Sequence, residues 1–220
     1  MLSKLPLPRR LSTQTYLLAL VAAVVIPLLA FAAFLLTRYA ETERARFEAG
    51  AAQLARQVGL IVDGELAGLV AVLKGLATSS ALTEGDFGQF YLEARRLVLG
   101  SDQIVVLRDL GTRQFLNTQL PFGSPLPPAI AITPAESAAF AAGRPVISEV
   151  YLSPVSGEAR VAAAIPVFRD DRPKYILAIT VPTSRILGAL APAVPPGWII
   201  GVGDRDGTYV ARSERHEEFT

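Results

Sequence analysis

The stretch ARVAAAIPVFRDDRPKYILAITV, residues 159–181, is the strongest indication of the fold in this sequence. Its two halves, residues 159–169 and 174–181, contain the branched and aromatic apolar residues that are typical of short β-strands. The residues between them, Asp170 to Pro173, have the composition of a tight turn. The sequence therefore predicts an antiparallel hairpin at this place.

The hairpin extends upstream into a three-stranded antiparallel meander. Residues 145–152 form the third expected strand, and the turn at residues 153–157 joins it to the hairpin. We expect the apolar side chains of all three strands to form a core: Val146, Ile147, Val161, Ile165, Val167, Ile176 and Ile179.

A helix and a further hairpin are expected before the meander. Asp86 is followed three residues later by a glutamine, which predicts a capped helix over residues 87–99. Residues 103–108 and 113–118 are short β-rich runs on either side of a turn. The segment 121–130 contains four prolines, which predict a loop.

A second helix-start signal follows this loop. Thr133, Pro134 and Glu136 stand in the order of cap, first-turn proline and capping-box acid. They predict a short helix that ends near Ala142, before Gly143.

Beyond the meander the sequence predicts a short helix over residues 183–190 and a stiff proline-containing linker over 191–197. Residues 198–202 and 208–211 then form one more expected hairpin. Because this hairpin has no further strands to pair with, we interpret the chain as the front part of a longer protein or as a truncated gene product.

The N-terminal segment 16–36, YLLALVAAVVIPLLAFAAFLL, contains no charged residue and is interrupted only by Pro27. At ~1.5 Å per residue a helix of this length spans roughly 30 Å, the thickness of a hydrocarbon core. We interpret it as a single transmembrane helix. The alternative is a cleaved signal peptide with a site near Ala30, although the apolar run is longer than such peptides need.

The charges on either side of this segment predict its orientation. Residues 1–15 carry three basic residues and no acid, whereas the far flank mixes both signs. The basic residues are Lys4, Arg9 and Arg10, and the far flank has Arg38, Arg44 and Arg46 with Glu41, Glu43 and Glu48. The positive-inside rule places the N-terminal tail in the cytoplasm and residues 40–220 outside the inner membrane.

Residues 39–79 have the pattern of a long helical stalk that leaves the membrane. Leucines recur at spacings of three and four, which predicts one apolar face. That face contains Leu54, Val58, Ile61, Val62, Leu66, Leu69, Leu73 and Leu76. It either pairs with a second copy in a homodimer or packs on the domain that follows, and its glycines weaken the coiled-coil alternative.

Composition excludes several classes of function. The 181 residues after residue 39 carry 17 Lys and Arg and 20 Asp and Glu, a formal charge of −3 that gives no support to nucleic-acid binding. The chain has no cysteine, and its single histidine, His216, is expected to be a solvated surface residue. Disulfides, thiolate chemistry and hydrolase triads are therefore not expected.

Several polar residues of the expected strands are candidates for a binding site. A pocket for a small anion needs donors that converge on one face of a sheet, and arginine suits a carboxylate best. The candidate ligand-binding residues are Arg108, Asn117, Thr118, Tyr151, Arg160 and Tyr175. The alternative for each is a solvent-facing position on the polar side of its strand.

No metal site, cofactor site or catalytic residue is expected. The run Asp204 to Gly207 lacks the further oxygen ligands of a calcium loop, so we interpret it as a turn. Gly201 and Gly203 lack the third glycine of a dinucleotide-binding fingerprint.

Five phrases in order resemble the extracytoplasmic double Cache (PAS-like) sensor region of bacterial sensor histidine kinases, particularly those of the HWE type. They are GELAGLV (64–70), VVLRDLGTRQFLNT followed by PFGSPLP (105–127), GRPVISEVYLSPVSG (143–157), AAAIPVFRDDRPKYILAITV (162–181) and PPGWIIGVGDRDGTYVARS (195–213).

This resemblance implies an α+β fold with a transmembrane helix, a long helical stalk and an antiparallel PAS-like (Cache) sheet with flanking helices. It assigns residues 80–192 to a membrane-distal Cache-like domain and 197–220 to an incomplete second one. It also implies a homodimer in which a small solute binds the distal domain and shifts the long helices. The arginine candidates make a carboxylate one possible ligand. The full Tyr-Arg-Trp-Tyr-Asp set of amino-acid-binding Cache domains is absent, so an amino-acid ligand is not implied.

The output of the parent protein stays open among three alternatives. The resemblance favours a histidine kinase of a two-component system, but similar sensor regions precede diguanylate cyclases and chemotaxis transducers. The chain itself has no catalytic domain and is not expected to be an enzyme. A different class of function is a single-span envelope protein that binds another protein through an exposed apolar patch.

Overall fold

The computed structural model describes residues 13–214, and the chain divides into two compact units, residues 1–55 and 56–220. The first helix, α1 (Thr13–Ala77), runs through the boundary between them. Each unit is described separately below. His216 and the basic residues Lys4, Arg9 and Arg10 lie outside the described residues.

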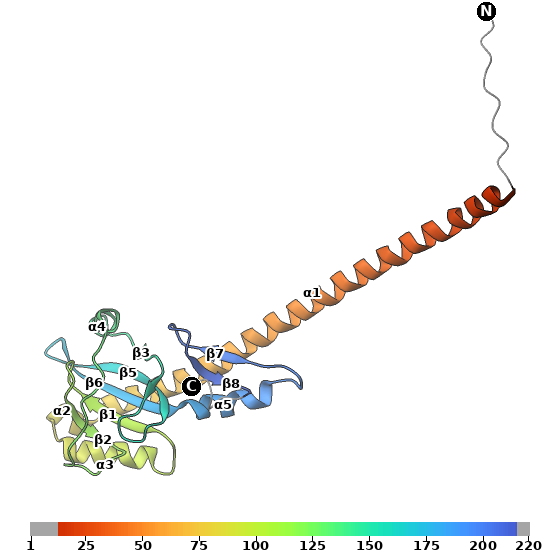
Figure 1. Ribbon diagram of the computed structural model, residues 1–220. Helices are drawn as coiled ribbons and strands as arrows, with labels where there is room; N and C mark the ends of the chain where they lie inside the picture. The colour runs from red at the N-terminus through yellow and green to blue at the C-terminus, as the bar shows by residue number, and fades with distance from the viewer. Residues whose placement is uncertain (1–12, 215–220) are drawn as a thin grey trace, which may run out of the picture. The chain divides into compact units, whose positions relative to one another are not determined.

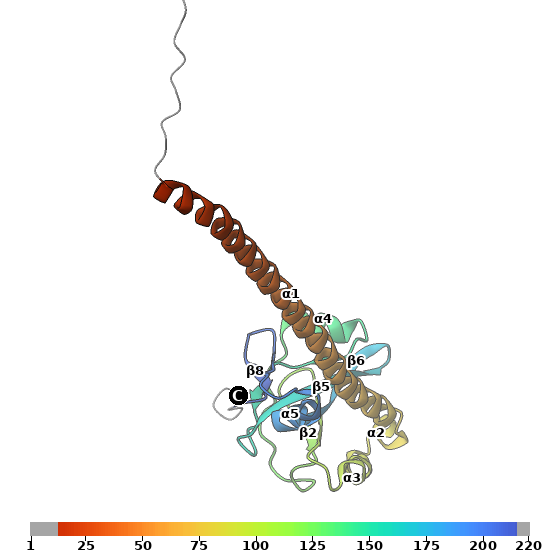
Figure 2. The ribbon, with the colours of Figure 1, turned by 90° about the vertical axis from the view of Figure 1, so that its right-hand side faces the viewer.

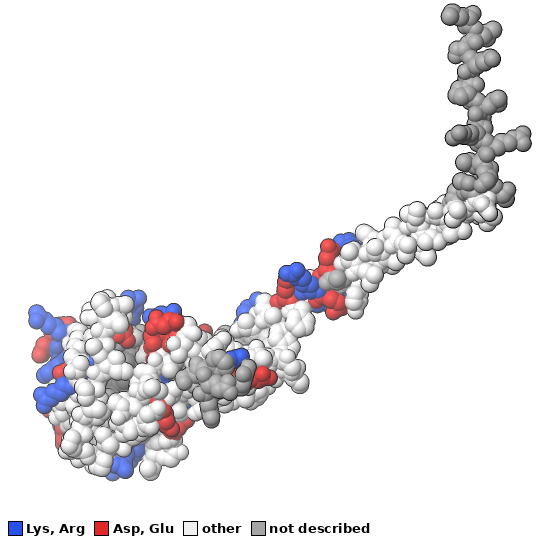
Figure 3. Space-filling model, in the orientation of Figure 1, with Lys and Arg blue, Asp and Glu red and all other residues white. Residues whose placement is uncertain are grey.

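The described part of the first unit, residues 13–55, is helical throughout. Its apolar side chains from Leu20 to Leu36 are exposed, and no charge interrupts them until Arg38 (Figure 3). Ion pairs follow in the next turns, including Arg44 with Glu48 at 2.9 Å. Among the described residues α1 is the one helix long and apolar enough to cross a membrane.

The second unit is built on a six-stranded antiparallel sheet (Figure 1). Its strands are β1 (Ile104–Arg108), β2 (Gln114–Asn117), β3 (Val146–Ile147), β4 (Tyr151–Leu152), β5 (Ala159–Arg169) and β6 (Arg172–Pro182). The order is β2-β1-β6-β5-β3, and β4 also pairs with β5. The predicted α+β class and antiparallel sheet are confirmed.

The predicted hairpin of residues 159–181 is confirmed, with a tighter turn than expected. Asp170 and Asp171 have φ values of 50° and 58°, so a two-residue turn of the kind that suits twisted hairpins joins β5 to β6. Strand β6 therefore begins at Arg172 and not at Lys174.

The prediction of one continuous strand over residues 145–152 is wrong, because regular pairing stops at Ile147 and resumes at Tyr151, with one backbone bond remaining between, from the Ser148 N–H to the Ala162 carbonyl at 2.8 Å. The Ser148 hydroxyl oxygen accepts from the Ala162 backbone N–H at 2.9 Å, and the Val150 N–H donates to the Asp204 carboxylate at 3.1 Å. These side-chain bonds take the place of strand pairing and separate β3 from β4.

Four short helices and one 3₁₀ turn follow α1 among the described residues. They are α2 (Ser80–Glu84), α3 (Phe87–Val98), α4 (Pro134–Ala141), α5 (Thr183–Leu190) and the 3₁₀ turn η1 (Ala191–Ala193). The Asp86 carboxylate accepts from the Gln89 N–H at 2.9 Å, and the expected capping box of Thr133 and Glu136 is present. Helix α2, capped by the Ser79 hydroxyl, was not predicted.

The two faces of the sheet differ in how closely they are packed. One face is completely filled, with Leu107, Leu177 and Ile179 inaccessible to solvent. Helix α3 packs on this face at β1 and β2, while α4 packs against β3, β5 and β6 from the other side (Figures 1 and 2). The second face is the one that contains a hollow.

The part of α1 that belongs to the second unit, from residue 56, packs on the domain and does not protrude as a free stalk. Val58, Leu69, Leu73 and Leu76 are buried, with Leu73 wholly inaccessible. Over this part of the helix the apolar stripe therefore serves packing on the domain, the second of the two alternatives drawn from the sequence.

Arg185 of α5 links three elements of the second unit. Its guanidinium lies 3.4 Å from the Glu65 carboxylate of α1 and 2.9 Å from the Asp102 carboxylate, which follows α3. This pair of contacts ties the long helix to the end of the sheet.

A second, two-stranded sheet follows η1. Its strands are β7 (Gly201–Gly203) and β8 (Tyr209–Arg212), as the last predicted hairpin requires. The Asp204 carboxylate accepts from the N–H groups of Asp206 and Thr208, at 3.1 and 2.8 Å. These bonds form a turn stabilised by an aspartate side chain, in agreement with the interpretation of this run as a turn.

Candidate functional site

A pocket of about 300 Å³ lies on the less filled face of the sheet. Its floor comes from alternate residues of β1, β5 and β6, because side chains two apart along a strand share a face. Ala162, Ala164 and Ala178 form the middle of this floor and are too small to fill it. The hollow is thus a direct result of three small residues in register.

The cover of the pocket comes from three segments. Residues 128–133, helix α4 and the segments 148–150 and 153–155 on either side of β4 line the rest of the pocket. Phe140 of α4 packs with Val146 and Ile176 and anchors the helix over the floor. Most of the lining is apolar, and polar groups gather toward the two ends of β1, which lie roughly 13 Å apart.

Arg108 occupies one end of the pocket, as part of its lining. Its side chain is buried, and its guanidinium donates to the backbone carbonyls of Asp109, Gly111 and Ile130. Burial lowers the pKa of Arg108, and the negative charges of Asp109 and Glu136 act against that shift. Arg108 therefore fastens the β1–β2 turn and the cover segment together at the pocket wall.

Asn117 pairs with Val106 of β1 and also lines the pocket, while Gln114 is the cross-strand partner of Arg108. Its side-chain oxygen accepts from the Gln119 N–H at 3.0 Å, and its amide nitrogen lies 3.4 Å from the Gln114 oxygen. These bonds hold an amide group at the wall of the pocket.

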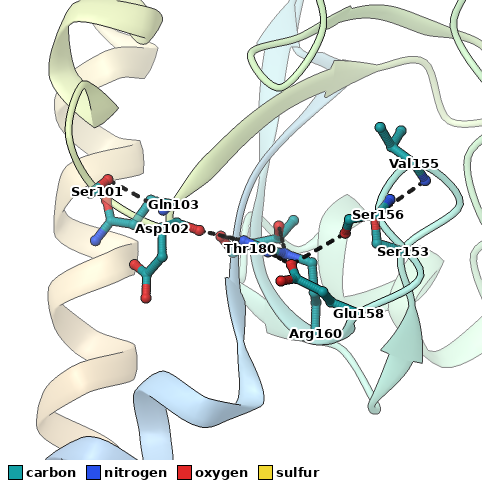
Figure 4. Close-up of polar contacts among 9 residues, drawn as sticks. All are labelled: Ser101, Asp102, Gln103, Ser153, Val155, Ser156, Glu158, Arg160 and Thr180. Carbon is teal, nitrogen blue, oxygen red and sulfur yellow. Dashed lines mark hydrogen bonds and ion pairs between the residues drawn. The ribbon is translucent and has the colours of Figure 1, made fainter.

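Tyr151 and Thr180 form the polar group at the other end. Tyr151 is the cross-strand partner of Arg160, and Arg160 donates from Nε to the Thr180 hydroxyl at 3.0 Å. Burial raises the pKa of Tyr151, while a hydrogen bond with Thr180 and the charge of Arg160 act in the opposite direction. Figure 4 shows Arg160 between Thr180, Asp102 and Glu158.

Three of the six candidate residues do not line this pocket. The Thr118 hydroxyl accepts from the Val105 N–H at 2.9 Å and so replaces a ladder bond. Arg160 lies behind the pocket wall, and both residues line a separate surface groove. Tyr175 is on the opposite face, with its ring 5.6 Å from that of Phe87 and 5.4 Å from that of Phe115. The structure therefore brings together Arg108, Asn117 and Tyr151 only.

Sequence reasoning missed several residues of the pocket. Glu136 was recognised only as a capping residue, and Glu149 and Thr180 were not singled out, although all three line the hollow. The signal that was available is the set of alanines within two otherwise bulky strands, since small residues in register on one face leave room for a ligand.

The site carries no arrangement for metal or nucleophilic chemistry. Within residues 13–214 no group of three or more His, Cys, Asp or Glu side chains is close enough to hold a metal ion. The Ser153 hydroxyl accepts from the N–H groups of Val155 and Ser156, which makes it part of a turn (Figure 4).

Solved ligand-binding sensor domains share this fold. The ligand-binding domain of the Pseudomonas fluorescens chemoreceptor CtaA, in complex with L-serine, has a TM-score of 0.56 at 12% identity, over 71% of this chain and 68% of that one. The ligand-binding domain of the Pseudomonas aeruginosa PAO1 amino acid chemoreceptor PctC, in complex with GABA, has a TM-score of 0.52 at 16% identity. The match covers 73% of this chain and 72% of that one.

The sensor domain of a histidine kinase shares the fold as well. The sensor domain of Vibrio cholerae DctB has a TM-score of 0.53 at 11% identity, over 74% of this chain and 65% of that one. No family model matches the chain, and no curated protein sequence matches it. At these identities the likeness shows the fold alone, a Cache-like arrangement of helices around an antiparallel sheet.

Proposed function

We propose that this chain is the extracytoplasmic sensing portion of a membrane-bound two-component sensor histidine kinase. Residues 16–36 anchor it, residues 1–15 lie in the cytoplasm and residues 40–220 lie outside. The observation that carries the proposal is the covered pocket on a Cache-like sheet, lined by apolar residues with polar groups toward its ends.

The proposed ligand is a small solute with an apolar body. The volume of about 300 Å³ is at the lower end of the range for small-molecule sites. Arg108, Asn117 and Tyr151 are the proposed contacts retained from the sequence. The solved neighbours crystallised with L-serine and GABA make amino acids and other carboxylates the first compounds to test.

The parent protein is proposed to be a kinase of the HWE type with a double Cache sensor region that works as a homodimer. The sequence phrases support the kinase type, and the two-stranded sheet of β7 and β8 supports a second Cache module. A chemoreceptor is the second candidate, because two of the three neighbours described above are chemoreceptors. The gene sequence around this segment distinguishes a kinase from a chemoreceptor or a diguanylate cyclase.

A thermal-shift screen of the full chain in detergent tests the proposal. The panel contains amino acids, carboxylates, sugars and polyamines, and a ligand at a hundred times its Kd adds ~2.7 kcal/mol to stability. A compound that raises the melting temperature supports a solute sensor. A cooperative melt that no compound shifts favours the protein-interaction alternative.

A further inference from the structure

The segment between β3 and β4, residues 148–150, is a partition between two hollows. The pocket of about 300 Å³ lies on one side and a hollow of about 290 Å³ on the other, and Ser148 and Glu149 line both. Much of the second hollow is lined by apolar side chains of α1, α5 and the β7–β8 hairpin, namely Val62, Leu66, Ile186, Val202 and Val210. Close packing is what holds most interior segments in place, so a partition with space on both sides has room to move.

The main sheet holds the two ends of this partition but not its middle. The Ser148 N–H donates to the Ala162 carbonyl at 2.8 Å, and the Ser148 hydroxyl accepts from the Ala162 N–H at 2.9 Å. Regular pairing resumes only at Tyr151. Glu149 and Val150 therefore depend on another element for their position.

That element is the turn of the β7–β8 hairpin. The Val150 N–H donates to Asp204 Oδ2 at 3.1 Å, and in return the Arg205 N–H donates to the Glu149 carboxylate at 3.0 Å. Asp204 Oδ1 accepts from two N–H groups of its own turn, those of Asp206 and Thr208. One oxygen of Asp204 thus shapes the turn while the other holds the partition.

We propose that Asp204 is a positioning residue of the pocket, which fixes the partition and passes its movements to the β7–β8 hairpin. Asp204 does not itself line the pocket, so it acts without touching a solute. By linkage, an occupant that favours one position of the partition also favours one position of the hairpin, and the reverse. This proposal rests on the proposed solute-binding function and adds the element to which occupancy of the pocket is communicated.

A covalent probe tests this coupling without the natural solute. The chain has no cysteine, so Ala162→Cys places a single thiol in the pocket floor, beside the partition. Benzyl methanethiosulfonate then attaches a benzyl group to that thiol as a disulfide. Ala142→Cys, modified in the same way at an exposed position, is the control. Hydrogen exchange of the full chain in detergent micelles is measured over residues 148–150 and 201–212, with and without the benzyl group.

We expect the benzyl group in the pocket to change the exchange rates of both segments by at least about threefold, and the group at residue 142 to change neither. Asp204→Asn keeps one oxygen for the N–H groups of the turn and places an amide nitrogen, which is a donor, against Val150. Combined with Ala162→Cys, it should confine the change to the partition. Asp206→Asn removes the same charge from the same turn and should leave the coupling intact.

Hairpin exchange that the benzyl group leaves unchanged, or changes equally with and without Asp204→Asn, overturns the proposal. Solute binding then still stands, because the thermal-shift screen tests it separately and the benzyl probe does not depend on it. If Asp204→Asn by itself leaves the hairpin unprotected, Val150→Pro makes the same comparison, since it removes the donated N–H and keeps the Asp204 turn.

Discussion

At the scale of single residues, the buried arginines of this domain act first as structural donors. Arg108 holds three backbone carbonyls, and Arg160 holds two carbonyls and a hydroxyl. Each arginine brings together segments that are far apart in the sequence. Sequence analysis selected both for possible anion binding, but only the structure reveals how many of their donors the backbone already uses.

Replacement of Arg108 by alanine should lower the free energy of unfolding by about 2 kcal/mol, because buried carbonyls lose their donors. Arg108→Lys should recover only part of this loss, since an ammonium does not reproduce the planar fork. Chemical denaturation followed by Trp198 fluorescence measures both. Arg144→Ala, at an exposed position, is the matched control. If Arg108→Ala were as stable as the wild type, Arg108 would not be a structural donor to these carbonyls.

Tyr151 should make stability depend on alkaline pH. Its pKa in the folded protein lies above the ordinary value of 10.0, because burial disfavours the phenolate. The unfolded chain therefore loses this proton first, and the contribution to stability is complete below pH ~10 and is lost as the pH rises through the folded pKa. Melting temperatures from pH ~8 to ~11 should fall less steeply in Tyr151→Phe than in the wild type. If the melting temperatures of the wild type and of Tyr151→Phe fell in parallel with pH, Tyr151 would not be the source of this pH dependence. Tyr39→Phe, in an exposed part of α1, is the control.

At the scale of elements, caps and turns were the features best predicted from sequence. Helices α3 and α4 begin at the predicted caps because those bonds join residues three apart and need no tertiary partner. The break between β3 and β4 was missed because the Asp204 carboxylate that holds it lies 54 residues away in the chain.

The candidate site was only partly predicted, for a similar reason. The pocket face of β6 contains Thr180 and Ala178, while Tyr175 belongs to the other face by simple alternation. The cover segments, however, reach this face through tertiary contacts such as that of Arg108 with Ile130. A pattern within one strand contains no information about which distant loop will close over it.

The capping box of α4 makes a prediction for the pocket cover. The Thr133 hydroxyl oxygen accepts from the Glu136 N–H at 3.2 Å, and the Glu136 carboxylate accepts from the Thr133 N–H at 2.6 Å. Thr133→Ala should lower stability by about 1 kcal/mol, and Thr133→Ser should retain most of it. Hydrogen exchange of residues 134–141 should increase in the alanine variant. Unchanged exchange there would indicate that packing of Phe140 alone holds the helix.

The contacts of Arg185 with Glu65 and Asp102 predict a contribution to the free energy of unfolding that depends on salt concentration. All three side chains are 33–41% exposed, so Arg185→Ala should cost about 0.5–1 kcal/mol at low salt. The difference from the wild type should shrink at ~1 M salt because the charges are then screened. Denaturant titrations at low and high salt provide the measurement, and a loss that does not depend on salt would mean that packing of the side chain dominates.

At the scale of the whole molecule, the chain combines a long apolar helix with a Cache-like domain whose filled face buries the end of that helix. The pocket lies on one face of this sheet, and Val62 and Leu66 of α1 share a hollow with Val161, which belongs to the other face. This arrangement suits a domain in which solute binding is communicated to a helix, and it depends on the pocket being a true binding site.

The most direct test of that claim is to fill the pocket. Ala178→Leu adds an apolar side chain to the middle of the floor, and Ala142→Leu makes the same change at an exposed position. Titration calorimetry of a ligand found in the screen should give wild-type affinity for Ala142→Leu and at least a tenfold higher Kd for Ala178→Leu, a loss of about 1.4 kcal/mol. Equal affinity of a folded Ala178→Leu protein would place the binding site elsewhere and contradict the account.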